Sequence, residues 1–145
     1  MFSAQLQALH ILRSIRVNFQ RRMEPILREA DLSLIQILLL LGISSGDIEN
    51  VNGVCRVLEL GQGNASTLCK KMEQSGLLLR ERSRQDERVV QLSLTQAGEE
   101  KVQTLLQEID RRWGQVHRDH PALVRQLMEG LAAADALLRL PEEQE

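Results

Sequence analysis

The apolar residues of this chain recur mainly every three or four positions, and only one short stretch alternates as a strand does. From about Ser3 to Glu29 this spacing predicts a long amphipathic helix, which Pro25 should kink or end early. A near-continuous apolar run follows Ser33, with Gln36 at the spacing of a capping box, and predicts a buried helix that stops at Gly42.

Two short helices are expected next, on either side of a turn at Leu60 to Gly63. The first runs from about Val51 to Glu59, and the second ends before Gly76. Apolar residues of the second helix fall on one stripe, which should be buried: Ala65, Leu68, Cys69 and Met72. Its other side is polar and cationic: Asn64, Ser66, Thr67, Lys70 and Lys71. This order predicts a helix-turn-helix whose second helix suits a groove.

A two-stranded ribbon is predicted directly after the helix-turn-helix. Three arginines have the spacing of two that places side chains on one face of a strand: Arg80, Arg82 and Arg84. The return strand alternates apolar and polar residues, and its apolar members are Val90, Leu92 and Leu94. Residues 85–87 form the loop, where Asp86 is expected to pair with Arg88 and hold the tip in position.

Two more helices complete the predicted fold. Thr95 can cap a helix that runs toward Trp113, and Pro121 opens a last helix that ends near Pro141. The chain is therefore expected to be mainly α with a small two-stranded β-wing, as in a winged helix-turn-helix. The leucines and isoleucines of the long terminal helices exceed what one small chain can cover, which predicts a dimer.

Charge is uneven along the chain, although the formal net charge of the 145 residues is only −2. Residues 51–94 carry seven basic and five acidic groups, whereas residues 95–145 carry six basic and ten acidic groups. This balance argues against indiscriminate coating of nucleic acid, yet a local patch of arginines can bind phosphate whatever the total charge.

Neither a membrane segment nor a disulfide framework is expected. The longest apolar run, Ile37 to Leu41, is far shorter than the roughly 18 residues of a membrane span, and the N-terminus does not resemble a secretory signal. Two cysteines, Cys55 and Cys69, are too few for a disulfide scaffold. We therefore expect a cytoplasmic protein. One interpretation of Cys69 is a redox switch, but a small core residue is the favoured interpretation for both cysteines.

The sequence offers no convincing metal, cofactor or catalytic site. His117 and His120 could bind zinc together with His10 or an acid, but their spacing favours a surface pair. The segment 61–66, GQGNAS, lacks the preceding strand and the third glycine or lysine of a nucleotide-binding loop. We therefore expect neither a metal nor a cofactor, and no enzyme.

The segment GLLLRERSRQDERVVQLSLTQAG resembles the wing of the MarR family (multiple antibiotic resistance regulators). The matching residues are a Gly-Leu start, an Asp-x-Arg turn and a closing Leu-Thr-x-x-Gly: Gly76, Leu77, Asp86, Arg88, Leu94, Thr95 and Gly98. Leu32, Ser33 and Gln36 upstream, and Met72 and Glu73 before Gly76, also fit the pattern. The resemblance covers nearly the whole chain.

This resemblance implies a homodimeric repressor of transcription that binds a pseudo-palindromic operator in double-stranded DNA. It divides the single domain of residues 1–145 into dimerisation helices (1–30 and 96–145) and a DNA-binding lobe (31–95). The expected DNA-binding residues lie on the second helix and the wing: Asn64, Ser66, Thr67, Lys70, Lys71, Arg82, Arg84 and Arg88. A phenolic or lipophilic small molecule is the implied effector.

Two alternatives stay open at this point. One is a winged-helix module that binds proteins and has lost DNA binding. The other, which the sequence favours less, is a thiol or metal sensor.

Overall fold

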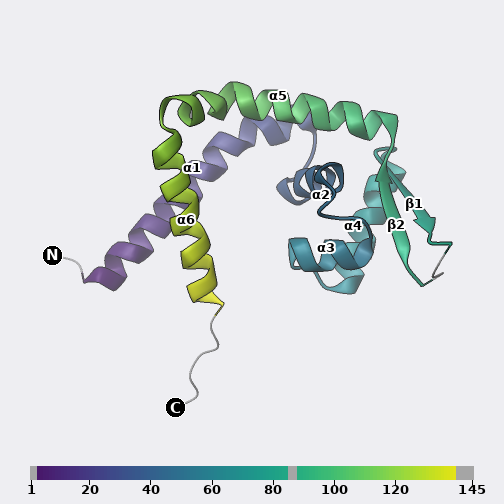
Figure 1. Cartoon of the computed structure of the whole chain (residues 1–145), viewed down its shortest axis with the longest axis horizontal. Helices are drawn as coiled ribbons and strands as arrows, with labels where there is room; N and C mark the ends of the chain where they lie inside the picture. The colour runs from purple at the N-terminus through teal and green to yellow at the C-terminus, as the bar shows by residue number, and fades with distance from the viewer. Residues whose placement is uncertain (1–2, 85–87, 140–145) are drawn as a thin grey trace, which may run out of the picture. The chain divides into compact units, whose positions relative to one another are not determined.

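The computed structural model describes residues 3–84 and 88–139 of the chain. Its described part contains six helices and one antiparallel pair of strands (Figure 1). In chain order they are α1 (Ala4–Ala30), α2 (Leu34–Ser45), α3 (Val51–Leu58), α4 (Gln62–Gln74), β1 (Leu78–Arg82), β2 (Val90–Leu94), α5 (Gln96–Asp119) and α6 (Pro121–Leu138). The predicted mainly α fold with a two-stranded wing is confirmed. The chain divides into two compact units, Met1–Leu106 and Gln107–Glu145, which are described separately below.

The first unit is built on an apolar core to which every helix of the unit and both strands contribute. Side chains of α1 to α4 supply most of it: Met23, Ile26, Ala30, Ile37, Leu39, Leu40, Val54, Ala65, Cys69 and Met72. The remainder comes from Ile48, the two strands and the start of α5: Ile48, Leu78, Leu92, Val102 and Leu105. Because α4 and β1 pack together in this core, the helix and the wing form one structural unit.

Helix α1 continues through Pro25 and ends only at Ala30, so the expected early end is wrong. Proline removes its own N–H from the helical ladder, but the residues that follow can hold the helix by packing. Ile26 and Ala30 are both buried. The helix ends where Asp31 adopts the left-handed conformation, with φ of 54°.

Helix α2 begins as predicted and ends later than predicted. Ser33 and Gln36 form the capping box: Ser33 N–H donates to Gln36 Oε1 at 2.8 Å, and Gln36 N–H donates to Ser33 Oγ at 3.4 Å. The predicted stop at Gly42 is wrong, because the helix runs to Ser45 and Gly46 supplies the left-handed cap with φ of 83°. Gly42 instead allows close packing, since a Cβ there would lie 2.6 Å from Cδ1 of the buried Ile48.

The two strands pair in antiparallel register, with Leu78 opposite Leu94 and Arg82 opposite Val90. β1 ends at Arg82, so Arg84 lies beyond the strand and does not share its face. The segment before α3 joins the other edge of the wing, because Leu92 N–H donates to the Glu49 carbonyl at 2.9 Å. The predicted loop at residues 85–87, including Asp86, lies outside the described residues.

The junction between the wing and α5 explains the closing Leu-Thr-x-x-Gly pattern. Thr95 Oγ1 donates to the Gly76 carbonyl at 2.6 Å and accepts from Gly98 N–H at 3.0 Å, so it caps α5 as predicted. Thr95 N–H also donates to the Leu77 carbonyl at 3.2 Å. A Cβ on Gly98 would overlap this carbonyl oxygen of Leu77. Glycine is therefore needed here for close approach of two backbones.

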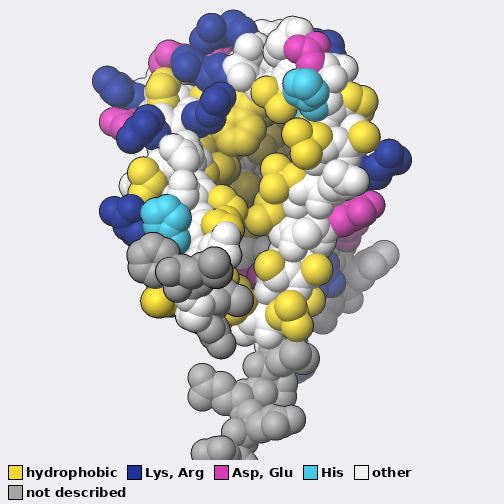
Figure 2. All heavy atoms as spheres, turned by 90° about the vertical axis from the view of Figure 1, so that its left-hand side faces the viewer, with side chains coloured by type: hydrophobic (Ala, Val, Ile, Leu, Met, Phe, Trp, Pro, Cys, Tyr) yellow, Lys and Arg dark blue, Asp and Glu magenta, His cyan; other side chains and the backbone are white. Residues whose placement is uncertain are grey.

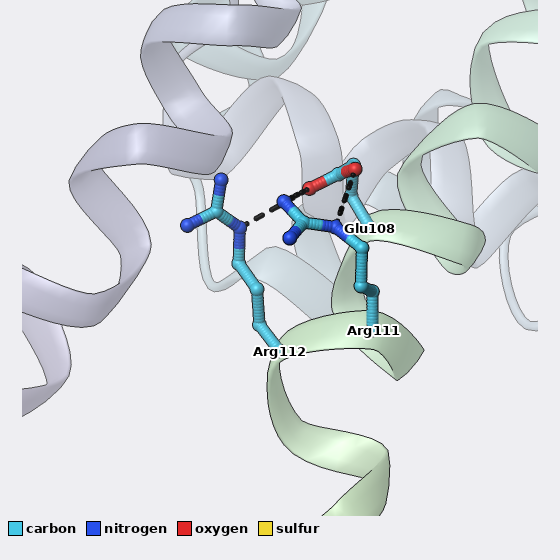
Figure 3. A network of polar contacts seen from close by, with 3 residues as sticks. All are labelled: Glu108, Arg111 and Arg112. Carbon is cyan, nitrogen blue, oxygen red and sulfur yellow. Dashed lines mark hydrogen bonds and ion pairs between the residues drawn. The ribbon is translucent and has the colours of Figure 1, made fainter.

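The second unit contains the C-terminal part of α5 and all of α6, which Pro121 opens as predicted. α5 extends to Asp119, beyond the expected end near Trp113. On α5, the carboxylate of Glu108 accepts hydrogen bonds from two guanidinium groups (Figure 3). Its carboxylate accepts from Arg111 at 3.0 and 2.7 Å and from Arg112 Nε at 3.1 Å. The bonds from Arg111 lower the pKa of Glu108, so the carboxylate stays charged further into the acid range.

Large hydrophobic side chains remain exposed along both terminal helices, and yellow side chains cover much of these helices in Figure 2. On α1 they are Leu6, Leu9, Ile11, Leu12, Ile15 and Phe19. On α6 they are Leu123, Leu127, Met128, Leu131, Leu137 and Leu138. No helix in residues 3–84 and 88–139 has the length and apolarity that crossing a membrane requires.

We predict that Gly98→Ala lowers the free energy of unfolding by about 2 kcal/mol or more, because the added methyl group meets a backbone carbonyl that cannot rotate away. Gly63→Ala is the matched control. Gly63 lies inside α4 with nothing within 4 Å of its Cβ position, so helix propensity should raise stability by roughly 0.5–1 kcal/mol. Urea unfolding of both variants measures the difference, and equal stability of the two would contradict the proposed packing.

Candidate nucleic-acid interface

Helix α4 has one buried side and one exposed side. Ala65, Cys69 and Met72 are fully buried and Leu68 is half-buried, which confirms the predicted apolar stripe. The residues predicted for DNA binding lie on the rest of the helix surface. Asn64, Thr67, Lys70 and Lys71 are exposed, and Ser66 is half-buried. The helix thus presents hydroxyl, amide and ammonium groups to its surroundings.

The turn between α3 and α4 is short and tightly bonded. Glu59 ends α3 in the left-handed conformation with φ of 54°, and Leu60 N–H donates to the Cys55 carbonyl at 3.1 Å. Gly61 precedes α4 as its N-cap and makes no side-chain hydrogen bond. The first N–H groups of α4 therefore lack a side-chain acceptor from the cap residue.

The arginines of the wing divide into two groups. Arg82, Arg84 and Arg88 are exposed, as a role in DNA binding requires. The side chain of Arg80 is only 17% exposed, and its Nη1 lies 3.3 Å from Oε2 of Glu73 on α4. Arg80 therefore ties the wing to α4, and the expectation that it projects together with Arg82 and Arg84 is wrong. Asp86, the residue expected to position Arg88, is not among the described residues.

A hollow of about 430 Å³ lies between the starts of α3 and α4 and the wing. Its polar lining comes from all three elements: Asn50, Asn52, Gln62, Ser66, Arg80 and Arg88. Among the residues that the structure describes, none of those lining the hollow is acidic, so this part of it is suited to an anionic or polar partner. Nε of Arg80 is buried and has no hydrogen-bond partner among the residues that the structure describes.

Asn50, Asn52 and Gln62 line this hollow but are not among the predicted DNA-binding residues. Asn50 caps α3, where its Oδ1 accepts from Gly53 N–H at 2.9 Å. Gln62 Nε2 donates to Asn52 Oδ1 at 3.0 Å, and Cys55 Sγ donates to Gln62 Oε1 at 3.0 Å. No local pattern indicates these contacts, because they join residues of two different helices.

The structure places the two thiols in different environments. Cys69 is fully buried, and this burial raises the pKa of its thiol, although the positive charge of Arg80 lowers it in part. Cys55 is half-buried. Within residues 3–84 and 88–139, no three His, Cys, Asp or Glu side chains are grouped so that they could hold a metal ion.

The fold and the interface together define a winged helix-turn-helix protein. A sequence profile of the transcriptional regulator SarA/Rot family matches residues 21–105. The chain belongs to this family, which has the winged helix of the MarR regulators, and the resemblance to MarR proteins is confirmed.

Two relatives are themselves named as transcriptional regulators. The organic hydroperoxide resistance transcriptional regulator of Bacillus subtilis is 35% identical over 78 residues, which are 54% of this chain and 53% of that protein. The HTH-type transcriptional regulator SarZ of Staphylococcus epidermidis is 31% identical over 85 residues, or 59% of this chain and 57% of that protein. The matches thus span about half the length of these curated relatives.

Solved structures of MarR proteins share the fold. MarR of E. coli in its apo form has a TM-score of 0.66 and 15% identity, covering 90% of this chain and 98% of that one. A MepR–DNA complex from S. aureus has a TM-score of 0.61 and 19% identity, and the match covers 84% of this chain and 98% of that one. NadR in complex with 4-hydroxyphenylacetate has a TM-score of 0.68 and 19% identity, and the match covers 91% of this chain and 94% of that one.

We predict that alkylating reagents modify Cys55 well before Cys69 in the native protein. A thiol reacts as its thiolate, and the raised pKa of Cys69 leaves less thiolate at neutral pH than an ordinary thiol has. Burial adds a steric barrier. Mass spectrometry of iodoacetamide-treated protein, digested after timed quenching, gives both rates. A faster reaction at Cys69 would contradict its placement in the core, and unfolding in urea should make the two rates similar.

Proposed function

We propose that this protein is a cytoplasmic transcriptional repressor that binds double-stranded DNA as a homodimer. One observation carries this proposal. The polar side of α4 lies next to a wing that has three exposed arginines. A regulator of transcription, rather than an enzyme, also agrees with the family and with the names of the relatives.

Each element has a distinct role in the proposed complex. α4 enters the major groove, where Asn64, Ser66 and Thr67 face base edges and Lys70 and Lys71 contact phosphates. Arg82, Arg84 and Arg88 bind along or in the minor groove, because guanidinium groups remain charged and are attracted to its negative potential. The MepR structure, which has the same fold, is a complex with DNA.

The exposed terminal helices support the dimer. Leu9 on α1 and Leu123, Leu127 and Leu138 on α6 are between 54% and 76% exposed. Burial of apolar area stabilises by about 25 cal/mol per Å², so leaving these rows in water costs free energy that a second copy would recover. A two-fold symmetric dimer would present two lobes to a pseudo-palindromic operator.

A groove in the first unit is suited to an effector. It has a volume of about 570 Å³, within the usual range for small-molecule sites, and its lining is mainly apolar. Leu38, Val57 and Leu106, all more than 40% exposed, line it, and Asp47 and Ser45 lie at its polar part. We propose that a small lipophilic or phenolic molecule binds here and lowers DNA affinity. NadR, which shares the fold, holds 4-hydroxyphenylacetate.

For the wing, we predict that Arg84→Ala and Arg88→Ala each weaken binding to all duplexes alike, because both arginines contact phosphates. Each substitution should also reduce the slope of log affinity against log salt concentration by about one. Asn64→Ala should instead change which sequence is preferred. Fluorescence anisotropy over a series of salt concentrations measures both effects, and Arg28→Ala on α1 is the control. Unchanged affinity in both wing variants would contradict the wing assignment. No salt-dependent binding by the unmodified protein would favour a protein-interaction module.

For the dimer, we predict that Leu127→Glu gives a monomer at micromolar concentration, because a carboxylate would be buried without a partner in the interface. Gln126→Glu adds the same charge to the neighbouring exposed position and should leave the dimer intact. Sedimentation velocity distinguishes the two masses. A dimeric Leu127→Glu variant would place the interface away from this face of α6.

A further inference from the structure

The hollow between α3, α4 and the wing has positive charge in its wall. Two of its lining residues are arginines, Arg80 and Arg88, and none of the described residues that line it is acidic. Arg80 is held in this wall, because its side chain is only 17% exposed and its Nη1 lies 3.3 Å from Oε2 of Glu73. The lining is therefore suited to a small anionic group.

The protein does not satisfy the guanidinium of Arg80 completely. Its Nε is buried and has no hydrogen-bond partner among the described residues. Buried donors without an acceptor are rare in folded proteins, because each costs free energy. An anion in the hollow would offset this cost, since its negative charge acts on the whole guanidinium whether or not it contacts Nε.

Gly63 is an independent sign that a group approaches this wall. It is the second residue of α4, and it lines the hollow. Neither conformation nor packing requires glycine here, because its φ is not positive and an added Cβ would have no protein atom within 4 Å. Glycine is less favourable than alanine in a helix, but it permits close approach of a ligand to the backbone. Glycine at this position leaves room beside the two arginines.

A phosphate of the DNA backbone is the anion that the proposed function would bring to this place. If α4 lies in the major groove and the wing in the adjoining minor groove, the strand that separates the two grooves passes between them. The hollow lies there, because its lining comes from the starts of α3 and α4 and from the wing. Phosphate contacts of this kind fix the register of a protein on the duplex.

We propose that the hollow binds one backbone phosphate in each half-site, that Arg80 is its cationic ligand, and that Gly63 gives it room. This inference rests on the proposed DNA-binding function. It adds to that function a contact at the junction of α4 and the wing, which is separate from the contacts of the three exposed arginines.

The test replaces one phosphate at a time by an uncharged methylphosphonate, in a duplex that the full-length protein selects from a random pool. Neutralising one particular phosphate per half-site should lower the affinity by about 10-fold or more, as expected for a hydrogen bond to a charged group. Arg80→Ala should weaken binding to the unmodified duplex by a similar factor. Neutralising the same phosphate should then have no further effect. Such non-additivity identifies a directly interacting pair, which a general loss of structure does not produce.

Gly63→Ala is a second variant, which separates the phosphate site from the stability of the fold. Its methyl group would occupy room in the hollow, so DNA affinity should fall several-fold even though the stability of the protein rises. The effect of neutralising the same phosphate should also become smaller. Gln74→Ala, at the exposed C-terminal end of α4, is the control and should change neither affinity nor the response to any methylphosphonate.

Three outcomes would contradict the inference. If the unmodified protein binds the duplex but no phosphate is coupled to Arg80, the phosphate site is wrong and the proposed function stands. If the unmodified protein selects no duplex, both are wrong. A free oxyanion is the other source of the same chemistry, and thermal unfolding in inorganic phosphate and in chloride at equal ionic strength tests it. A higher Tm in phosphate for the unmodified protein but not for Gly63→Ala, without a coupled DNA phosphate, would overturn the assignment to DNA.

Discussion

Burial of one side of α4 is the constraint on which the proposed DNA-binding lobe depends. Ala65, Cys69 and Met72 are fully buried, so the opposite side of the helix must face outward. The same core holds Leu78 and Leu92, which fix the base of the wing. Because α4 and β1 pack directly on each other, the polar side of the helix and the arginines of the wing keep one relative position. The base of the candidate interface is therefore held by the core.

Local patterns along the chain predict which helices and strands form. They do not predict which distant residues come into contact. The alternation of Val90, Leu92 and Leu94 and the capping box of Ser33 and Gln36 are local, and both are confirmed. Gly42 does not end α2, because glycine is favoured both by a close contact, as with Ile48 here, and by a left-handed helix cap, which Gly46 supplies. The Arg80–Glu73 pair and the contacts of Gln62 join different elements. Sequence spacing contains no signal for either.

The distribution of charge, and not its total, determines what the lobe attracts. Arg80 pairs with Glu73 and lies against α4. The side chains of Arg82, Arg84 and Arg88 are exposed to solvent. Charges in physiological salt are screened beyond about 8 Å, so distant acidic residues weaken this local potential little. A protein with a net charge of −2 can thus present exposed arginines to a partner that contacts only this region.

A lobe of this size makes few contacts by itself, and this links the apolar terminal helices to the proposed DNA binding. α4 spans 13 residues, and only its N-terminal part can reach base edges, so one lobe would read a short sequence. Joining two lobes makes the second binding event intramolecular, at an effective concentration that can reach the millimolar range. The gain requires the lobes to be held about one helical turn of DNA apart. Helices long enough to fix that spacing, with exposed leucines along them, are what such a dimer needs. Specificity and affinity in the proposed complex would therefore arise in different parts of the chain.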